Sequence, residues 1–407
     1  MQINRRALLG SAAASAAALP FRRGRAQGKL AVKIGVLTDM SGTYKDLSGQ
    51  VSVAAARQAV EDFGVAGKNM AVDILSADHQ NKPDVAAAIA SQWFDRDGVD
   101  VILDGTNSGC GLAIAGVAKA KNKIHLNAGA ASSDLTGSAC NANTVHWVYD
   151  TYELAKSTGG SLVKAGGNSW YFLTADYAFG KALQRDTTKF VEGAGGKVLG
   201  SSAYPFPGTS DFSSFLLQAQ SSGAKVLGLA NAGADTVNSI KQAKEFGIES
   251  QLAALLLFIS DVHALGLQTA QGIAVTSSFY WDANDRTRAW SRRFEPKAPG
   301  VRATMTQAGV YSSALHFLKT AEAMGGSVHQ SGAATVARMR EIPVDDDCFG
   351  KSEIRADNRC IHPSYLWTVK KPSESQYPWD YYKLVSSLPA DQAFRPIAEG
   401  GCSLVKA

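Results

Sequence analysis

Three short turns contain the residues of this chain that are best suited to bind a small molecule. Each turn is rich in Ser, Thr, Asn, Gly and Ala, and each directly follows an apolar stretch. Hydroxyls and backbone N–H groups in such turns bind anions and carboxylates, and small side chains leave space for a ligand. The candidate contacts in these turns are Met40, Ser41, Tyr44, Asn107, Ser108, Gly109, Ala130, Ala131 and Ser132.

Aromatic side chains lie at or just after the ends of several predicted strands. Aromatic faces combined with a few polar groups suit a small, partly apolar ligand. For Phe279 and Trp281, packing between two parts of the chain is an equal alternative. Further candidate contacts in the second half of the chain are Asp176, Tyr177, Phe179, Asn231, Ala232, Phe258 and Tyr280.

Motifs for catalysis and metal binding are largely missing. The chain has no GxGxxG after a strand, no GxxxxGK[ST], no HExxH and no GxSxG. It also lacks CxxC and HxxxH spacings, so we expect no metal and no cofactor. His125 lies beside a predicted strand and is interpreted as a packed histidine. We predict a protein that is not an enzyme, although a Ser/His/Asp arrangement built only in three dimensions stays open.

The elements that position these turns follow a repeated strand–turn–helix pattern. Ile34–Thr38 is a buried strand, and a helix follows with Val51, Ala55 and Val60 on its apolar side. A second series of the same kind begins at Trp170. In open α/β sheets, ligands bind beyond the carboxyl ends of the strands, where all these turns would lie. The pattern predicts an α/β fold, with an irregular Pro-rich tail over 372–407.

The N-terminus resembles an export signal. Paired arginines, Arg5 and Arg6, precede the apolar run Ala7–Leu19, which is too short to span a bilayer. Small residues favour cleavage after Ala26. The paired arginines favour twin-arginine export, with a general secretory signal as the alternative. We therefore expect a periplasmic protein.

Removing this leader changes the charge of the chain. The whole sequence has 41 basic and 36 acidic residues, and five arginines lie in 1–26. The remainder is balanced, because 41 − 5 = 36. The pI of 8.8 therefore gives no support for nucleic-acid binding. No later apolar run approaches the length of a membrane span.

Export would permit disulfides among the five cysteines. Cys348 and Cys360 lie on either side of a turn signal and could bridge a hairpin. Cys110 and Cys140 flank adjacent predicted strands and could also pair. Cys402 would then be unpaired. Two bridges and one thiol can be drawn in about 15 ways, so the pairing stays open.

Several motifs in order resemble periplasmic substrate-binding proteins of the branched-chain amino-acid type, which serve ABC importers. They are KIGVLTDMSG, GTNSG, NAGAASSDLTG, TADYAFG, NAGADTVNSIKQAKEFG and FGKSEIRADNRCIHPSYLWTVK. The resemblance implies the type I periplasmic binding fold, with two Rossmann-like lobes, three crossovers and a ligand cleft. The implied lobes are 27–147 plus 279–363, and 148–278 plus 364–407. It further implies a monomer that hands its ligand to a membrane permease.

The resemblance also implies roles for particular residues. A ligand carboxylate would meet Ser108, Ala130, Ala131 and Ser132, and the second lobe would add Tyr177 or Phe179 and the turn Asn231–Gly233. Amino-acid binders of this type have an acidic residue near Leu257–Phe258 that pairs with the ligand ammonium. This chain has Leu256-Leu257-Phe258 there, and an unpaired ammonium is costly to bury.

We therefore predict a binding protein for a small carboxylate, in particular an aromatic acid. LLLFISDVHALG and SSFYWDANDRTRAW resemble a subgroup of soil-bacterial binding proteins whose ligands are often aromatic acids. Branched-chain or other amino acids and amides are the alternative ligands. A ligand sensor with the same fold is the alternative role.

Overall fold

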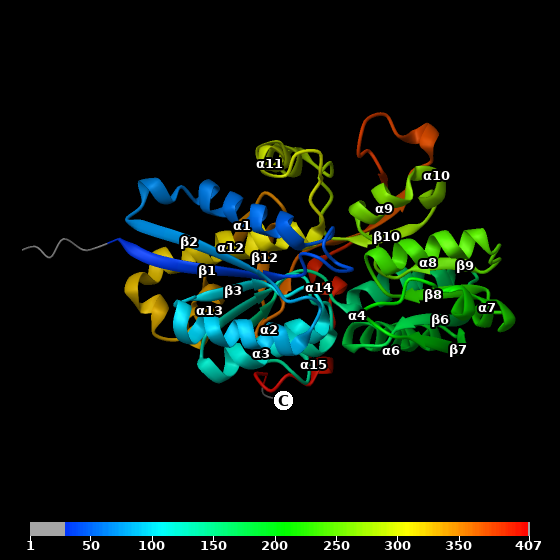
Figure 1. Ribbon diagram of the computed structural model, residues 1–407, viewed down its shortest axis with the longest axis horizontal. Helices are drawn as coiled ribbons and strands as arrows, with labels where there is room; N and C mark the ends of the chain where they lie inside the picture. Colours follow the sequence, from blue (N-terminus) through cyan, green and yellow to red (C-terminus); the bar gives the residue numbers. More distant parts are fainter. Residues whose placement is uncertain (1–28, 406–407) are drawn as a thin grey trace, which may run out of the picture.

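Two parallel β-sheets, each covered by helices on both faces, form two lobes (Figure 1). The computed structural model describes residues 29–405. The export signal predicted for 1–26 lies outside the described residues. The predicted two-lobed α/β fold is confirmed, and the cores of the lobes lie between their sheets and helices.

The first sheet has the strand order β2-β1-β3-β4-β5, and all its strands are parallel. Alternate residues of each strand face opposite layers. Val36 packs toward α1 and α12, whereas Leu37 packs toward α2 and α3. The elements are β1 (Leu30–Thr38), β2 (Met70–Asp78), β3 (Val101–Asp104), β4 (Ile124–Asn127), β5 (Thr144–His146), α1 (Gly49–Phe63), α2 (Pro83–Gln92), α3 (Ser108–Lys121) and α12 (Met305–Met324).

The second sheet repeats this topology in the order β7-β6-β8-β9, again fully parallel. Phe172 packs with α6 on one face, and Leu173 packs with α7 and α8 on the other. The elements are β6 (Ser169–Ala175), β7 (Lys197–Tyr204), β8 (Val226–Ala230), β9 (Gln251–Ala254), α6 (Ala178–Gly193), α7 (Ser213–Ser221) and α8 (Ala234–Glu245).

Two small antiparallel sheets complete the fold, in the orders β10-β14-β15 and β11-β12-β13. The irregular tail predicted for 372–407 is wrong in part, because β15 extends the first of these sheets. Most residues of β15 are exposed, so its sequence lacks the apolar alternation of a half-buried strand. The strands are β10 (Ala274–Ser277), β11 (Val344–Asp346), β12 (Gly350–Ile354), β13 (Cys360–Ile361), β14 (Ser364–Val369) and β15 (Tyr382–Leu388).

The chain passes between the lobes at three connections. They run from β5 to α4, from β10 to α11, and from β13 to β14. The sheet that contains β10 packs against the apolar core of the second lobe, whereas α11 contacts α1 of the first. The remaining helices are α4 (Thr151–Leu154), α5 (Gly160–Lys164), α9 (Ile259–Leu265), α10 (Leu267–Ala270), α11 (Asp285–Phe294), α13 (Gly332–Glu341), α14 (Ala390–Ala393) and α15 (Ile397–Gly400).

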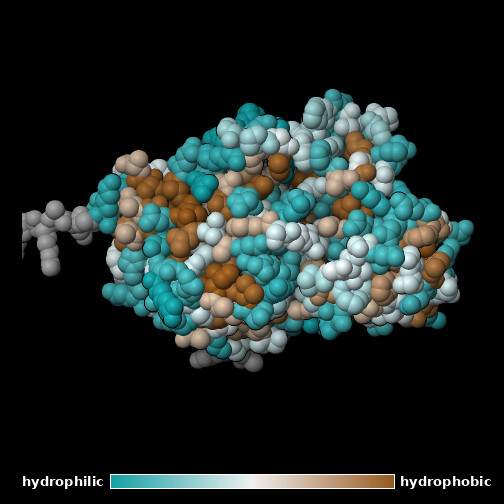
Figure 2. Space-filling model, viewed as in Figure 1, coloured by the Kyte–Doolittle hydropathy of each residue, from teal (hydrophilic) through white to brown (hydrophobic). Residues whose placement is uncertain are grey.

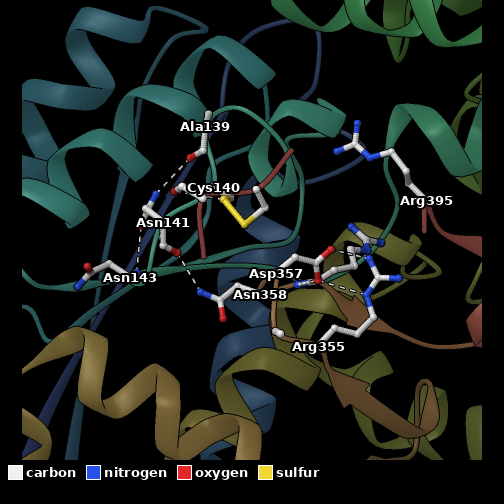
Figure 3. The surroundings of a disulfide bond; sticks show 12 residues. Ala139, Cys140, Asn141, Asn143, Arg355, Asp357, Asn358 and Arg395 are labelled. Atoms are coloured by element: carbon white, nitrogen blue, oxygen red, sulfur yellow. Dashed lines mark hydrogen bonds and ion pairs between the residues drawn. A yellow bond between two sulfur atoms is a disulfide. The ribbon is translucent and has the colours of Figure 1, made fainter. Parts of the chain in front are cut away.

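One disulfide joins Cys140 to Cys402, with a Cα–Cα distance of 5.5 Å (Figure 3). Both predicted pairings are therefore wrong. Cys348 precedes β12, whereas Cys360 pairs with Ile354 at the other end of that strand. The length of β12 therefore separates Cys348 from Cys360. Four residue steps of extended chain span about 13 Å, which is more than a disulfide can bridge.

The remaining cysteine of the predicted pairs, Cys110, has its side chain in the core beside α2. Within 29–405, Cys110, Cys348 and Cys360 are buried free thiols. The disulfide brings the C-terminal segment against the first lobe, where Arg395 Nη2 also donates to the Ser133 carbonyl at 2.8 Å.

The visible surface is mainly hydrophilic, with apolar residues in separate patches (Figure 2). Among residues 29–405, no helix has both the length and the apolar character needed to cross a bilayer.

Candidate functional site

The carboxyl ends of the two parallel sheets face each other, and the turns after their strands enclose a small cavity between the lobes. In each sheet the strand order reverses beside the first strand, between β1 and β3 and between β6 and β8. Ligands of open α/β sheets bind at such reversals. The lining residues are Tyr44, Leu47, Thr106, Asn107, Ser108, Gly129, Ala131, Tyr149, Tyr177, Phe179, Ala232, Leu256 and Phe258; we call this the inner cavity.

The inner cavity is nearly filled by the side chains that line it. Its free volume is about 10 Å³, which is room for about one water molecule. A larger ligand therefore requires the lobes to separate. In the closed arrangement, the Ala234 N–H donates to the Thr43 carbonyl across the cleft at 3.2 Å.

Aromatic rings from both lobes meet in the inner cavity. The hydroxyls of Tyr44 and Tyr177 are hydrogen-bonded to each other. Phe206 stacks on both rings, with centroid distances of 5.5 Å to Tyr44 and 4.2 Å to Tyr177. Burial raises the pKa of both tyrosines well above the usual value, so both hydroxyls stay protonated and able to donate. Tyr149 adds an edge contact to Phe258 at 5.8 Å.

No Asp, Glu, Lys, Arg or His is among the lining residues found within 29–405. Instead, helix N-termini converge on the cavity. Ser108 begins α3, Tyr177 caps α6 and Phe258 caps α9. The N-terminus of a helix carries a partial positive charge that stabilises anions. The site can therefore hold a carboxylate without a cationic side chain.

Ser108 lies at the centre of the polar wall. Its Oγ accepts from the N–H groups of Ala131 at 3.2 Å and Ser132 at 3.1 Å. The hydroxyl proton of Ser108 is then directed elsewhere, and a ligand oxygen can accept it. The Ala130 N–H donates to Asn127 Oδ1 at 3.0 Å. All three N–H groups proposed for a ligand carboxylate thus have protein acceptors in the closed arrangement.

The turn Met40–Tyr44 binds two carboxylates of the protein itself. Asp39 accepts from the N–H groups of Ser41, Gly42 and Tyr44 at 3.3, 2.7 and 2.8 Å. Asp78 accepts from the Met40 N–H at 3.2 Å and the Ser41 hydroxyl at 2.6 Å. The anion expected at this turn is therefore an internal one, and Tyr44 faces the inner cavity while Met40 and Ser41 do not line it.

A second, larger cavity lies on the other side of Leu47, which lines both cavities. This outer cavity has a volume of about 530 Å³ and is lined from both lobes, including by Met40, His263 and Trp379. The His263 ring stacks on Trp379 at 4.0 Å. Asp261 lines it too, and its Oδ2 accepts from the Phe258 N–H at 2.9 Å. Burial raises the pKa of Asp261 to about 7.

The structure brings half of the predicted site residues together in the inner cavity. They are Tyr44, Asn107, Ser108, Ala131, Tyr177, Phe179, Ala232 and Phe258. The side chain of Asn107 caps α3 by accepting from Gly109 and Cys110 at 2.8 and 3.2 Å, so Asn107 positions the turn. The predicted residues outside the lining are Met40, Ser41, Gly109, Ala130, Ser132, Asp176, Asn231 and Tyr280.

Several of these outlying residues have other partners. Tyr280 donates to the Trp379 carbonyl at 3.1 Å. Asn231 bonds with Thr236 and Ser239 at 2.7 and 3.1 Å and so supports the start of α8. Asp176 forms an exposed ion pair with Lys181 at 2.8 Å.

Five lining residues were not predicted: Leu47, Thr106, Gly129, Tyr149 and Leu256. Thr106 and Gly129 lie within the predicted turns, so their position was a usable signal. A Cβ on Gly129 would lie 1.9 Å from Thr106 Oγ1, so only glycine fits there. Tyr149 follows β5 in the first connection, and nothing local marks it or Leu47 as facing the cleft.

Comparison with known proteins identifies the family. A family model described as periplasmic binding protein matches residues 31–375. The chain belongs to the periplasmic binding protein family. It is of the branched-chain amino-acid type, whose members are ligand-binding proteins of ABC transporters and are in general not enzymes.

Solved structures agree with this assignment. A periplasmic binding protein from Burkholderia mallei is 49% identical, with a TM-score of 0.89, over 93% of this chain and 100% of that chain. A branched-chain amino-acid ABC transporter periplasmic ligand-binding protein from Burkholderia xenovorans is 38% identical, with a TM-score of 0.79, over 92% and 99%. A solute-binding protein from R. palustris, solved with benzoate, is 20% identical, with a TM-score of 0.79, over 92% and 99%; this last likeness concerns the fold alone.

Proposed function

We propose that this periplasmic binding protein captures an aromatic carboxylic acid in the inner cavity and delivers it to an ABC transporter permease. The carboxylate binds at Ser108 and the N-terminus of α3. The ring lies among Tyr44, Tyr177 and Phe258. The lobes close over the ligand by bending at the three connections.

The observation that carries this proposal is the combination of aromatic walls with a lining that has no charged side chain. An α-amino acid would bring an ammonium into this space, and burying it without a carboxylate is unfavourable. An aromatic acid needs only hydroxyl and helix N-terminal donors for its carboxylate. The R. palustris protein solved with benzoate has the same fold, which supports the idea that this architecture can enclose a ring acid.

The remaining parts of the proposal follow the family. The lobes are 27–147 plus 279–363 and 148–278 plus 364–407, and the end of the second lobe's last range packs back on the first lobe at Arg395 and Cys402. The protein acts as a monomer, and residues 1–26 direct its export to the periplasm. The neighbour from B. xenovorans is named for a branched-chain amino-acid transporter, so leucine and valine are the competing ligands.

Isothermal titration calorimetry with matched ligands tests the ligand class. We expect benzoate to bind, and benzamide, which has the same ring without the charge, to bind at least about tenfold more weakly because it lacks the charge-assisted hydrogen bond. Leucine and phenylalanine should give no heat. Phenylalanine is the informative control because it has both a ring and a carboxylate but adds the ammonium.

Binding of leucine or valine with no response to aromatic acids would overturn the proposed ligand class. In that case Asp104 is the carboxylate to examine. Its Oδ1 accepts the hydroxyl of Thr106, a lining residue, at 2.6 Å, and burial raises its pKa. Asp104→Asn should then abolish leucine binding. A role in sensing rather than transport would be indicated if deleting the permease left the response of cells to the ligand intact.

A further inference from the structure

A charged cluster is buried where the three connections between the lobes meet. Arg359 directly precedes β13 and the third connection, and its side chain is 0% exposed. Its guanidinium lies 3.5 Å from Asp150, which is in the first connection and is 2% exposed. On its other side the guanidinium stacks on the Phe394 ring at 3.9 Å. Both charges of this pair are therefore removed from solvent.

Glu153 joins the cluster from α4, directly after the first connection. Its side chain is fully buried. The Ser278 hydroxyl, in the second connection, donates to Glu153 Oε1 at 3.3 Å. Ser364, at the end of the third connection, faces the same carboxylate. The cluster thus contacts every segment that must bend when the lobes separate.

The hydrogen bonding of this cluster is incomplete in the closed arrangement. Within 29–405, Nε, Nη1 and Nη2 of Arg359 are buried without a hydrogen-bond partner. Buried charges with unsatisfied hydrogen bonds are costly. A change of lobe angle that alters these distances or admits water therefore changes the free energy of the cluster.

We propose that Arg359, Asp150 and Glu153, the hinge cluster, set the balance between the open and closed arrangements, and that protonation of Glu153 favours closure. The three residues act as positioning residues, because none of them lines the inner cavity. The proposal rests on ligand binding by lobe closure and not on the identity of the ligand.

The charges around Glu153 explain why its protonation would favour the closed arrangement. Arg359 and Asp150 balance each other, so an ionised Glu153 leaves the cluster with one excess negative charge. Burial is the main cause that raises the pKa of Glu153, to about 7. Burial and Arg359 lower the pKa values of His146 and His362, which are therefore neutral. The other groups near Arg359 are the Cys360 thiol, whose pKa burial raises, and Arg355, which pairs with Asp357 at 2.6 Å.

Opening of the lobes lets water reach Glu153 and lowers its pKa. The closed arrangement then binds the proton of Glu153 more tightly than the open arrangement does. The equilibrium between them therefore shifts toward the open arrangement as the pH rises through about 7. If the pKa of Glu153 differs by one unit between the two arrangements, affinity falls by about tenfold between acidic and alkaline buffer.

The test measures benzoate affinity from about pH 6 to about pH 8.5, a range in which benzoate stays ionised. We expect Kd of the native protein to rise about fivefold over this range for a one-unit difference in pKa, and Kd of Glu153→Gln to stay constant and tight. Arg359→Met removes the charge that stabilises ionised Glu153, so the transition should move to higher pH. Loss of packing alone would change affinity at every pH equally.

Asp261→Asn is the matched control, because burial also raises the pKa of Asp261 to about 7 although it lies at the outer cavity. The pH dependence should persist in this variant. Its loss in Asp261→Asn but not in Glu153→Gln would overturn the proposal, as would a constant Kd in the native protein.

Small-angle X-ray scattering without ligand separates this proposal from the ligand assignment. The radius of gyration of the native protein should increase with pH over the same range, and that of Glu153→Gln should not. This readout remains decisive if benzoate fails to bind. A radius of gyration that does not change with pH in the native protein would overturn the proposed role of the hinge cluster.

Discussion

At the scale of single residues, Ser108 carries most of the polar recognition proposed for the site. Its Oγ already accepts two N–H groups, which fixes the hydroxyl oxygen and directs its proton toward a ligand acceptor. A hydrogen bond from a neutral donor to a carboxylate contributes about 1.5–3 kcal/mol. Ser108 therefore couples the α3 N-terminus to the turn Ala130–Ser132 and to the ligand at once.

Replacing Ser108 with alanine should weaken benzoate binding by about tenfold or more, as measured by calorimetry. The loss is at the lower end of the range of a charged hydrogen bond, because the N–H groups of Ala131 and Ser132 lose their acceptor and become available to the carboxylate. Benzamide binding should change less, since it lacks the charge.

Ser132→Ala is a suitable control for this measurement. Ser132 is absent from the cavity lining, and its Oγ accepts the Asp134 N–H at 3.3 Å. Its affinity should stay within about twofold of the native protein. Equal losses in both variants would show that the turn as a whole, and not the Ser108 hydroxyl, holds the carboxylate.

At the scale of elements, the start of α8 fits closely against the first lobe. Gly233 has φ 61° and caps α8, and a Cβ there would lie 2.6 Å from the Thr43 carbonyl oxygen and 3.1 Å from the Tyr44 ring. The next residue, Ala234, makes the backbone hydrogen bond to Thr43 across the cleft. The absence of a side chain at Gly233 is thus a condition for closure.

Gly233→Ala should weaken ligand binding by at least about tenfold by blocking closure, which calorimetry would measure. Gly247→Ala provides the control, because Gly247 also has a positive φ, 63°, but a Cβ added there would have no atom within 4 Å. Both variants place a side chain at a positive φ and so add backbone strain of about 1–3 kcal/mol, and the melting temperature of each variant shows that it is folded before its affinity is compared. Only Gly233→Ala should lose affinity; equal affinities would contradict the closure argument.

The sequence alone predicted the parallel lobes well because their strands are apolar and their turns are rich in small residues. Val36, Leu37, Leu227 and Leu229 are fully buried, which makes such strands easy to recognise. The order of the elements then placed Tyr44, Ser108 and Tyr177 at one cleft. Residues that reach the site from irregular chain, such as Tyr149 and Leu47, have no local pattern and required the folded lobes.

The sequence alone also could not predict which acceptor the N–H groups of a turn would face. The turn Met40–Tyr44 has the composition of an anion site, but Asp39 and Asp78 fill its N–H groups. Their carboxylates reach it from the end of β1 and the end of β2, and the latter contact depends on the strand pairing Thr38 with Asp78. Composition therefore identified the donors correctly and could not identify their acceptor.

At the scale of the whole molecule, the C-terminal segment joins the two lobes a fourth time. β15 belongs to the sheet that packs on the second lobe, and Cys402 is bonded to Cys140 in the first. Between them, Lys156 Nζ donates to the Gln392 carbonyl, and Arg395 donates to Ser133. This segment crosses beside the three connections, near Asn358, whose side chain donates to the Asn141 carbonyl at 2.9 Å (Figure 3).

The double variant Cys140→Ser, Cys402→Ser should lower the free energy of unfolding by about 2–5 kcal/mol, because the disulfide closes a loop between residues 262 apart in sequence. Urea unfolding followed by circular dichroism measures this loss. Dithiothreitol should shift the midpoint of the native protein to that of the variant and leave the variant unchanged, since its three remaining cysteines are buried thiols. An unchanged midpoint in the double variant would mean that packing of Phe394 and the contact of Arg395 hold the C-terminal segment without the covalent bond.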